Sequence, residues 1–131
     1  MAGLVPYLHF AGSAREALTF YRDIFEGDLT LHTFADLGRT DGPPDAIGHG
    51  ILQGRVELFG ADAADGDVPL AVEGMMFSLL GTADPATLED WFASLSAGGT
   101  VNDPLQVRPW GAHDGQVTDR YGLRWLIGYE V

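Results

Sequence analysis

Apolar residues recur every three or four positions in two segments of the chain, and each segment lies between residues that begin and end helices. A capping box begins at Ser13, and Gly27 follows the first apolar stripe. The second segment begins with Asp84 followed by proline, a favoured N-cap and first helical residue. The spacing predicts helices over residues 13–26 and 84–97. The apolar stripes are Ala17, Phe20, Tyr21, Ile24 and Phe25 in the first, and Leu88, Trp91, Phe92 and Leu95 in the second.

The two helical segments superpose when one is shifted along the chain by 71 residues, which brings Ser13 onto Asp84 and Gly27 onto Gly98. One apolar extended segment precedes each helix, and three strand-like segments follow it. The chain therefore contains the pattern β-α-β-β-β twice, as an internal repeat. The expected strands are residues 4–10, 29–34, 48–53 and 56–59 in the first repeat, and 75–80, 100–107, 115–118 and 123–128 in the second.

The repeat predicts an α+β fold in which two βαβββ modules form a cupped mixed sheet with the helices on its outer face. One module is too small to bury a sheet face alone, so the two are expected to share a core in a single domain of residues 1–131. Module 1 covers about residues 1–60 and module 2 about residues 74–131. The acidic segment 61–73 is the expected linker between them.

Composition narrows the function classes. The chain has 46% hydrophobic and 20% charged residues, as a folded globular protein does. Its 19 acidic against 7 basic residues give a charge of −12, which disfavours nucleic acid and anionic membranes as partners. It has no cysteine, so disulfides and thiolate chemistry are excluded. No apolar run is long enough to span a bilayer and no signal peptide is expected, so the expected location is cytoplasmic.

Short motifs extend along nearly the whole chain and, with the repeat, carry a family resemblance. They are Pro6-Tyr7-Leu8-His9-Phe10, Ala17-Leu18-Thr19-Phe20-Tyr21, His49, Trp110-Gly111-Ala112, Val117-Thr118-Asp119-Arg120-Tyr121-Gly122 and Trp125. Together they resemble the PhnB-like branch of the vicinal-oxygen-chelate superfamily, which includes glyoxalase I, extradiol dioxygenases, fosfomycin-resistance proteins and bleomycin-binding proteins. The resemblance implies a small organic molecule bound in the cup, and a homodimer.

Proteins of this branch often carry the label 3-demethylubiquinone-9 3-methyltransferase, which the residues do not support. A methyltransferase needs a site of nucleotide size, usually a glycine-rich turn between a strand and a helix of a parallel sheet. Neither module opens with such a turn. We therefore expect no methyl transfer.

Alternation along the strands predicts which side chains enter the cup. Leu4, Pro6, Leu8 and Phe10 form a helix-facing set, which sends Val5, Tyr7 and His9 into the cup. Val56, Leu58 and Leu52 likewise pack on the helix, which sends Glu57, Phe59, His49 and Ile51 into the cup. The expected ligand-binding residues are Tyr7, His9, Ile51, Phe59, Met76, Trp110 and Leu126.

Glu57 and His49 form a candidate acid–base pair. If Gln53-Gly54-Arg55 is a three-residue turn, Glu57 lies opposite Ile51, and His49 is then a diagonal neighbour of Glu57 at about 7 to 8 Å. A partly desolvated carboxylate beside an imidazole suits proton transfer.

The resemblance also implies four metal-ligand positions, of which only Glu57 is retained. The others fall at about Val5 or Pro6, at Met76 and at Leu126. We therefore expect no metal or other cofactor at this position. A substitute divalent site made of His9, His49 and Glu57 is an open alternative.

Other residues read as structural. Asp119-Arg120-Tyr121-Gly122 has the composition of a tight turn, with the aspartate capping it and the glycine at positive φ. Trp125 should pack against a helix, His32 should be a surface residue of a strand, and His113 should lie in a loop.

Three functions are consistent with these patterns. The first is binding of a small organic molecule without metal. The second is a lyase, isomerase or conjugating enzyme that uses Glu57 and His49, with or without a divalent ion. The third is a protein that works through its dimer surface and keeps a vestigial pocket, since open strand edges need covering.

Overall fold

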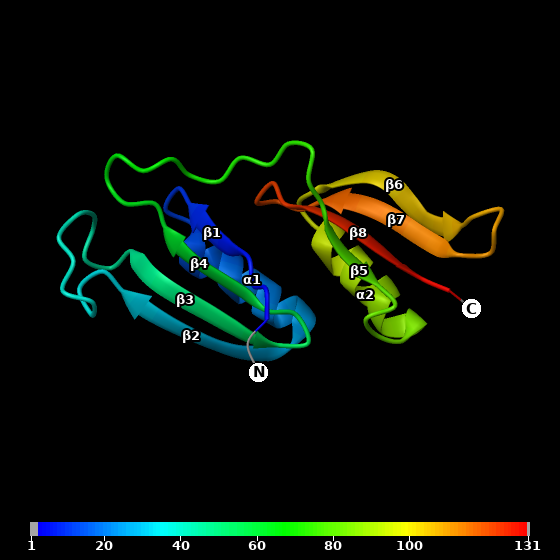
Figure 1. Cartoon of the computed structure of the whole chain (residues 1–131), viewed down its shortest axis with the longest axis horizontal. Coiled ribbons are helices and arrows are strands. Elements are labelled where there is room, and N and C mark those ends of the chain that lie inside the picture. The colour runs from blue at the N-terminus through cyan, green and yellow to red at the C-terminus, as the bar shows by residue number, and fades with distance from the viewer. Residues whose placement is uncertain (1–2, 131) are drawn as a thin grey trace. The chain divides into compact units, whose positions relative to one another are not determined.

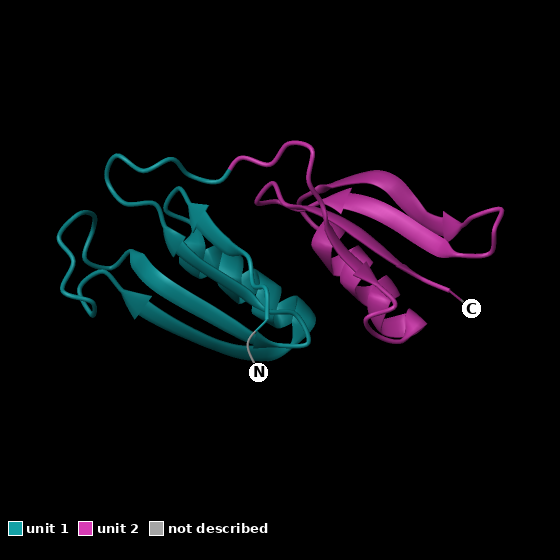
Figure 2. Ribbon diagram, in the orientation of Figure 1, with its two compact units in different colours: residues 1–70 teal, residues 71–131 magenta. Residues whose placement is uncertain are grey.

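The computed structural model describes residues 3–130, which fall into two compact units divided between Leu70 and Ala71 (Figure 2). We call the part before this division unit 1 and the part after it unit 2. The boundary between the units falls inside the expected linker. The linker was expected to begin at residue 61, however, and the last strand of the first unit continues through Asp62. Within residues 3–130, no helix is long and apolar enough to cross a bilayer.

Each unit contains one helix and four strands in the order β-α-β-β-β (Figure 1). The elements of unit 1 are β1 (Tyr7–Phe10), α1 (Ala14–Phe25), β2 (Gly27–Thr33), β3 (Ile47–Gly54) and β4 (Leu58–Asp62). The elements of unit 2 are β5 (Phe77–Leu80), α2 (Pro85–Ser96), β6 (Thr100–Val107), β7 (His113–Thr118) and β8 (Arg124–Tyr129). The repeat predicted from the sequence is confirmed.

The two sheets have the same topology. Unit 1 has the strand order β1-β4-β3-β2 and unit 2 the order β5-β8-β7-β6. In each sheet the first strand is parallel to the last, and the other pairs are antiparallel. The described strands therefore form two four-stranded mixed sheets, and the expected α+β class is confirmed.

The core of unit 1 lies between α1 and one face of its sheet. Leu18 and Tyr21 of the helix are fully buried, and Leu8, Leu52 and Leu58 meet them from the strands. Two glycines permit this packing, because a Cβ at Gly50 would collide with the Leu18 side chain and one at Gly60 would press on the Leu8 carbonyl. Of the expected stripe, Phe20 and Ile24 are only partly buried.

The core of unit 2 follows the sequence prediction closely. All four expected residues of α2 are buried, and Trp125 and Ile127 of β8 face them. The Trp125 ring also meets Phe77 of β5 edge to face at 5.3 Å. The expectation that Trp125 packs on the helix side is confirmed.

The first strand is shorter than expected. β1 begins at Tyr7, and Leu4, which was expected to pack on the helix, is fully exposed. Val56 is buried as expected but precedes β4 instead of belonging to it. Leu4 lies outside the paired strand and does not follow the predicted alternation.

The two helices begin in different ways, although their sequences superpose. Ser13 makes no side-chain hydrogen bond to α1, so the expected capping box is wrong. The buried carboxylate of Asp62 binds the helix start instead, with Oδ1 accepting from the Ala14 amide at 2.9 Å. In α2 the predicted cap is confirmed, because Asp84 Oδ1 accepts from the Thr87 amide at 2.8 Å.

The two glycines that follow the helices also have different roles. Gly98 has φ of 76°, the left-handed conformation expected of a glycine that ends a helix. In α1 the residue with positive φ is Glu26, with φ of 56° and ψ of 101°, and Gly27 already belongs to β2. A side chain at Gly27 would collide with the Gln53 carbonyl of β3.

The caps give a contrasting pair of stability predictions. Asp84→Ala should destabilise unit 2 by about 1 kcal/mol, the usual cost of losing an N-cap side chain, whereas Ser13→Ala should leave unit 1 within a few tenths of a kcal/mol of wild type. Urea unfolding followed by circular dichroism measures both, and tryptophan fluorescence follows unit 2, which contains all three tryptophans. Equal losses in the two variants would contradict the assignment of the caps.

Candidate functional site

Aromatic side chains from all four strands of unit 1 lie on the sheet face opposite α1. We call this set the aromatic face; it consists of Tyr7 and His9 from β1, Phe59 from β4, His49 from β3 and His32 from β2. The burial pattern agrees with the predicted alternation, because Leu8 and Phe10 are buried between them while Tyr7 is 42% exposed. Ile51 lies on the same face by alternation in β3.

The rings of the aromatic face contact one another in a continuous row. Tyr7 stacks on His49 with ring centroids 5.6 Å apart and an angle of 15° between planes. His49 in turn stacks on His32 at 6.4 Å and 6°. Phe59 meets both Tyr7 and His49 edge to face, at 6.5 and 6.0 Å. The tilted His9 ring lies 5.2 Å from Tyr7.

A hydrogen bond fixes the centre of this row. The Tyr7 hydroxyl lies 2.9 Å from Nδ1 of His49, so either group can donate, depending on the tautomer of the imidazole. Burial raises the pKa of the Tyr7 phenol, and the positive charge of Arg39 opposes this rise. The phenol therefore stays protonated at neutral pH and can donate to a neutral His49.

The register of the β3–β4 hairpin differs from the expectation. Phe59 pairs with Ile51 and Leu58 with Leu52, so the connection between these strands is two residues longer than the expected turn. The faces stay the same because the shift is even. Extending the register puts His49 opposite Ala61, four residues beyond Glu57 and about 13 Å from it along the strand. His49 is bonded to Tyr7, and this register does not favour a direct pair with Glu57.

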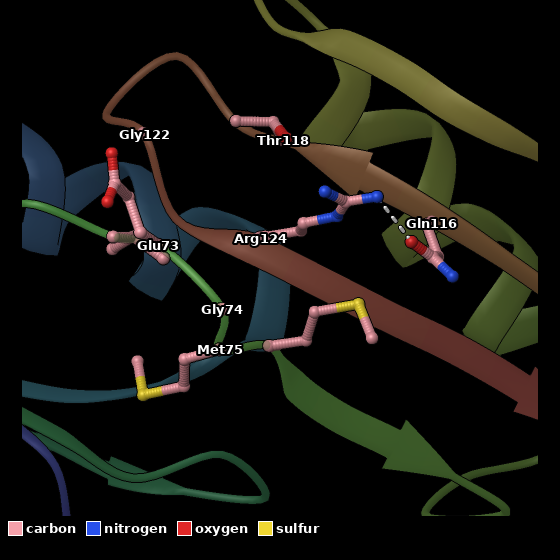
Figure 3. Close-up of a pocket in the computed structure, with 9 residues that line it drawn as sticks. Glu73, Gly74, Met75, Gln116, Thr118, Gly122 and Arg124 are labelled. Atoms are coloured by element: carbon pink, nitrogen blue, oxygen red, sulfur yellow. Dashed lines mark hydrogen bonds between the residues drawn. The ribbon is translucent and has the colours of Figure 1, made fainter.

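The remaining expected ligand-binding residues lie on unit 2. Met76, just before β5, lines a hollow of about 550 Å³ with Gln116 and Arg124 (Figure 3). Leu126 shares the open face of β8 with Arg124 by alternation. Trp110, 73% exposed, lines a different hollow of about 560 Å³, in the loop between β6 and β7.

His113 was expected in the loop before β7 but begins that strand. Its ring stacks on Tyr129 at 4.7 Å, and both residues line the same hollow as Trp110. Tyr129 donates to Glu89 of α2 at 2.7 Å, which ties this end of β8 to the helix.

The residues at the ligand positions of the superfamily do not fit its metal. Val5, Pro6 and Leu126 have no donor atom in their side chains, and Met76 offers only a thioether. Within residues 3–130, no three His, Asp or Glu side chains are grouped so that they could hold an ion. His32 and His49 of the aromatic face lie side by side as stacked rings, His49 Nδ1 is bonded to the Tyr7 hydroxyl, and the His9 ring contacts Tyr7.

His32 is the residue of this face that the sequence reading missed. It pairs with His49 across β2 and β3, which places both imidazoles on one face. Alternation did not show which face of the sheet His32 lies on. The residues of β2 are all partly or fully exposed, so this strand has no buried side that would mark its two faces. The signal that could have found it is the pairing of the two strands across the long loop between them.

Comparison with known proteins assigns the family. The Glyoxalase/Bleomycin resistance protein/Dioxygenase superfamily profile matches residues 3–127. The chain belongs to this superfamily. The match covers both units, as the predicted resemblance required.

Similar proteins extend this assignment. The chain is 32% identical to protein PA1353 of Pseudomonas aeruginosa, whose crystal structure superposes with a TM-score of 0.82 over 99% of this chain and 98% of that one. It is 25% identical to protein YjdN of Escherichia coli K12, over 95% of this chain and 92% of that protein. A putative 3-demethylubiquinone-9 3-methyltransferase, the PhnB protein of Bacillus cereus, is 19% identical with a TM-score of 0.77, over 98% and 99% of the two chains. The expected likeness to PhnB-like proteins is confirmed.

Proposed function

We propose that this superfamily member binds a small planar organic molecule on the aromatic face of unit 1, without a metal ion. The observation that carries the proposal is the Tyr7–His49 hydrogen bond at the centre of a row of rings from four strands. Aromatic surface with a few oriented polar groups is the usual composition of a small-molecule site. A flat aromatic ligand can add offset-stacked or edge-to-face contacts to such a group of rings.

The exposure of Tyr7 favours a role in ligand binding over a purely structural role. A tyrosine held by a hydrogen bond and still 42% exposed lies at the surface of its own unit. Such a side chain supplies rigid contact area at little further cost in conformational entropy, because stacking already limits its rotation. The face is therefore preorganised for a partner molecule.

Replacing the central ring should weaken binding. We expect Tyr7→Leu to lower the affinity for 2-naphthol, a neutral planar probe, by about two- to tenfold, because one aromatic pair contributes about 0.5 to 1.5 kcal/mol beyond its buried area. Tyr7→Phe should retain most of the affinity because it keeps the ring. Titration followed by the ring proton signals of His49 measures both variants.

The matched control is Trp110→Leu, which removes an exposed ring from unit 2 and should leave the affinity for 2-naphthol unchanged. Binding that survives Tyr7→Leu, or that is lost in Trp110→Leu, would place the site elsewhere. Absence of any saturable shift of the His49 signals would remove the proposal.

A second candidate is an acid–base enzyme, a lyase, isomerase or conjugating enzyme, and it now depends on Tyr7 and His49 more than on Glu57. The 2.9 Å hydrogen bond orients the imidazole, and an oriented imidazole is the commonest general base in enzymes. Glu57 is partly buried just before β4, and its use as an acid would need a bound molecule that extends along the strand from His49.

We do not propose methyl transfer. The label belongs to the Bacillus cereus protein, and a likeness at 19% identity shows the fold alone. The residues that join β1 to α1 are Ala11-Gly12-Ser13, and this is not a glycine-rich turn that could bind a nucleotide.

We further propose that the protein is a cytoplasmic homodimer. One support is the superfamily membership. The other is the open edge of β1: among the backbone hydrogen bonds of residues 3–130, the outer side of this strand makes only one, from the Leu70 amide to the His9 carbonyl at 2.7 Å. The third function, a dimer whose pocket is vestigial, would share this assembly but would not bind 2-naphthol.

A further inference from the structure

The open face of the second sheet carries an arginine inside a hollow. Arg124 of β8 lies beside Gln116 and Thr118 of β7, and Met75 of the segment before β5 lines the same hollow (Figure 3). Met76 of this segment also lines it. The hollow has a volume of about 550 Å³, which is enough for a small organic molecule. All of its lining residues belong to unit 2.

The guanidinium of Arg124 is oriented by a neutral group. Its Nη2 donates to Oε1 of Gln116 at 2.6 Å. The ion pairs between side chains of residues 3–130 involve three other arginines, Arg22, Arg39 and Arg108. The chain has 19 acidic and only 7 basic residues, yet the hydrogen-bond acceptor beside Arg124 is a neutral amide. The positive charge of Arg124 can therefore attract an anionic ligand.

We propose that this hollow binds the carboxylate of a small organic acid through Arg124. The planar guanidinium donates two parallel hydrogen bonds to a carboxylate, and the amide nitrogen of Gln116 offers a further donor beside it. Met75 and Met76, which are 47% and 39% exposed, present flexible apolar side chains to the rest of the molecule. The site belongs to unit 2 and does not depend on the aromatic face.

Charge in the hollow selects a monoanion. Glu73 lines the same hollow near Gly122, and Figure 3 shows its carboxylate directed away from the Gln116 end. A dianionic phosphate or phosphonate would meet stronger repulsion from Glu73 than a carboxylate would, and the charge of −12 on the whole chain acts in the same direction. The structure therefore favours a carboxylate over a phosphate.

Arg124 lies close to Leu126, the position at which the resemblance implies a metal-binding glutamate. The resemblance places a metal-binding glutamate at Leu126, and Arg124 is the preceding residue on the same face of β8. A guanidinium, like a metal ion, is cationic and can bind an anionic oxygen atom of a ligand.

The test uses the full chain with benzoate, the neutral benzamide of the same shape, and phenylphosphonate at mildly alkaline pH. We expect benzoate to shift the Nε–Hε signal of Arg124 saturably and to bind about tenfold more tightly than benzamide. Arg124→Gln should weaken benzoate about tenfold and leave benzamide unchanged. Arg55→Gln, in the exposed turn of unit 1, is the matched control and should change neither.

Further variants separate charge from folding. Arg124→Lys keeps the charge but loses the planar pair of donors, so it should bind benzoate with intermediate affinity. Glu73→Gln should strengthen benzoate binding, because it removes a negative charge from the hollow. Intact amide signals for β7 and β8 verify that each variant is folded.

Three results would overturn the proposal: benzoate binding no tighter than benzamide, benzoate binding unchanged in Arg124→Gln, or phenylphosphonate binding more tightly than benzoate. The outcome is independent of the proposed function, because 2-naphthol is followed at His49 of unit 1 and benzoate at Arg124 of unit 2. Failure at one site leaves the other result intact.

Discussion

Asp119→Ala should lower the free energy of unfolding of unit 2 by about 3 kcal/mol, because two buried donors lose a charged acceptor. Asp119 is 3% exposed, and its Oδ1 accepts from the amide of Leu123 at 3.1 Å. Its Oδ2 accepts from Nε1 of the buried Trp125 at 2.9 Å. Oδ1 also accepts from the Tyr121 amide at 2.8 Å, so this side chain fixes both the turn and the tryptophan.

Tryptophan fluorescence is the appropriate measurement, since Trp91, Trp110 and Trp125 all belong to unit 2. Asp90→Ala, on an exposed position of α2, is the matched control and should unfold at nearly the wild-type denaturant concentration. Asp119→Asn should lose less than Asp119→Ala, because its amide keeps one oxygen but turns an NH₂ group toward a donor. A midpoint for Asp119→Ala equal to that of Asp90→Ala would contradict the prediction.

The sequence predicted the elements where the signals are local. The turn at Asp119 needed only a capping aspartate and Gly122, whose φ is +89°. The start of α2 needed only Asp84, three residues before the amide that it binds. The faces of β1 followed from alternation, which places Tyr7 and His9 on the side opposite Leu8. Each of these signals acts within a few residues.

The pairing of side chains across strands could not be predicted in the same way. A register shift of two residues keeps every face unchanged, so alternation cannot distinguish a three-residue turn from the five-residue connection between Leu52 and Leu58. The pair of Glu57 and His49 depended on this turn, and the structure pairs His49 with Tyr7 instead. Alternation therefore predicts which face of the sheet a side chain lies on, but it does not predict which side chain of the neighbouring strand it contacts.

Contacts between residues distant in sequence are the second gap. His32 meets His49 only because β2 and β3 pair across a long loop. The sequence does not predict Arg124 as a ligand-binding residue, because no motif shows which arginine will lie beside a neutral amide in a hollow. The hollow around it is formed by two segments that are distant in the sequence, one from Val72 to Met76 and the other from Gln116 to Arg124.

The start of α1 shows the same limit, and it carries the other large stability effect. The sequence offered Ser13 as the cap, but the structure uses Asp62, 48 residues away from Ala14 in the chain. Its second oxygen accepts from the Ile47 amide at 2.9 Å. One buried carboxylate thus joins the start of α1, the start of β3 and the end of β4.

Asp62→Ala should therefore destabilise unit 1 by about 2 to 4 kcal/mol, against almost no change for Ser13→Ala. A hydrogen bond to a charged group contributes about 1.5 to 3 kcal/mol, and the effect of an anion at a helix N-terminus is up to about 1 kcal/mol. These contributions share one carboxylate and do not add in full, so the expected loss is smaller than their sum. Ala14, Ile47 and Asp62 are all buried, so water cannot readily replace the lost acceptor.

Hydrogen exchange at single amides gives the sharpest measurement, because unit 1 has no tryptophan. In Asp62→Asn, which keeps the size of the side chain, the amides of Ala14 and Ile47 should exchange faster than in wild type. Asp28→Asn, on an exposed position of β2, is the matched control and should leave both protected. Unchanged protection at the two amides in Asp62→Asn would show that the helix start is held by other contacts. Because Asp62 joins β3 to β4, the same substitution should also loosen His49 against Phe59, so a change in their ring signals would connect this buried carboxylate to the aromatic face.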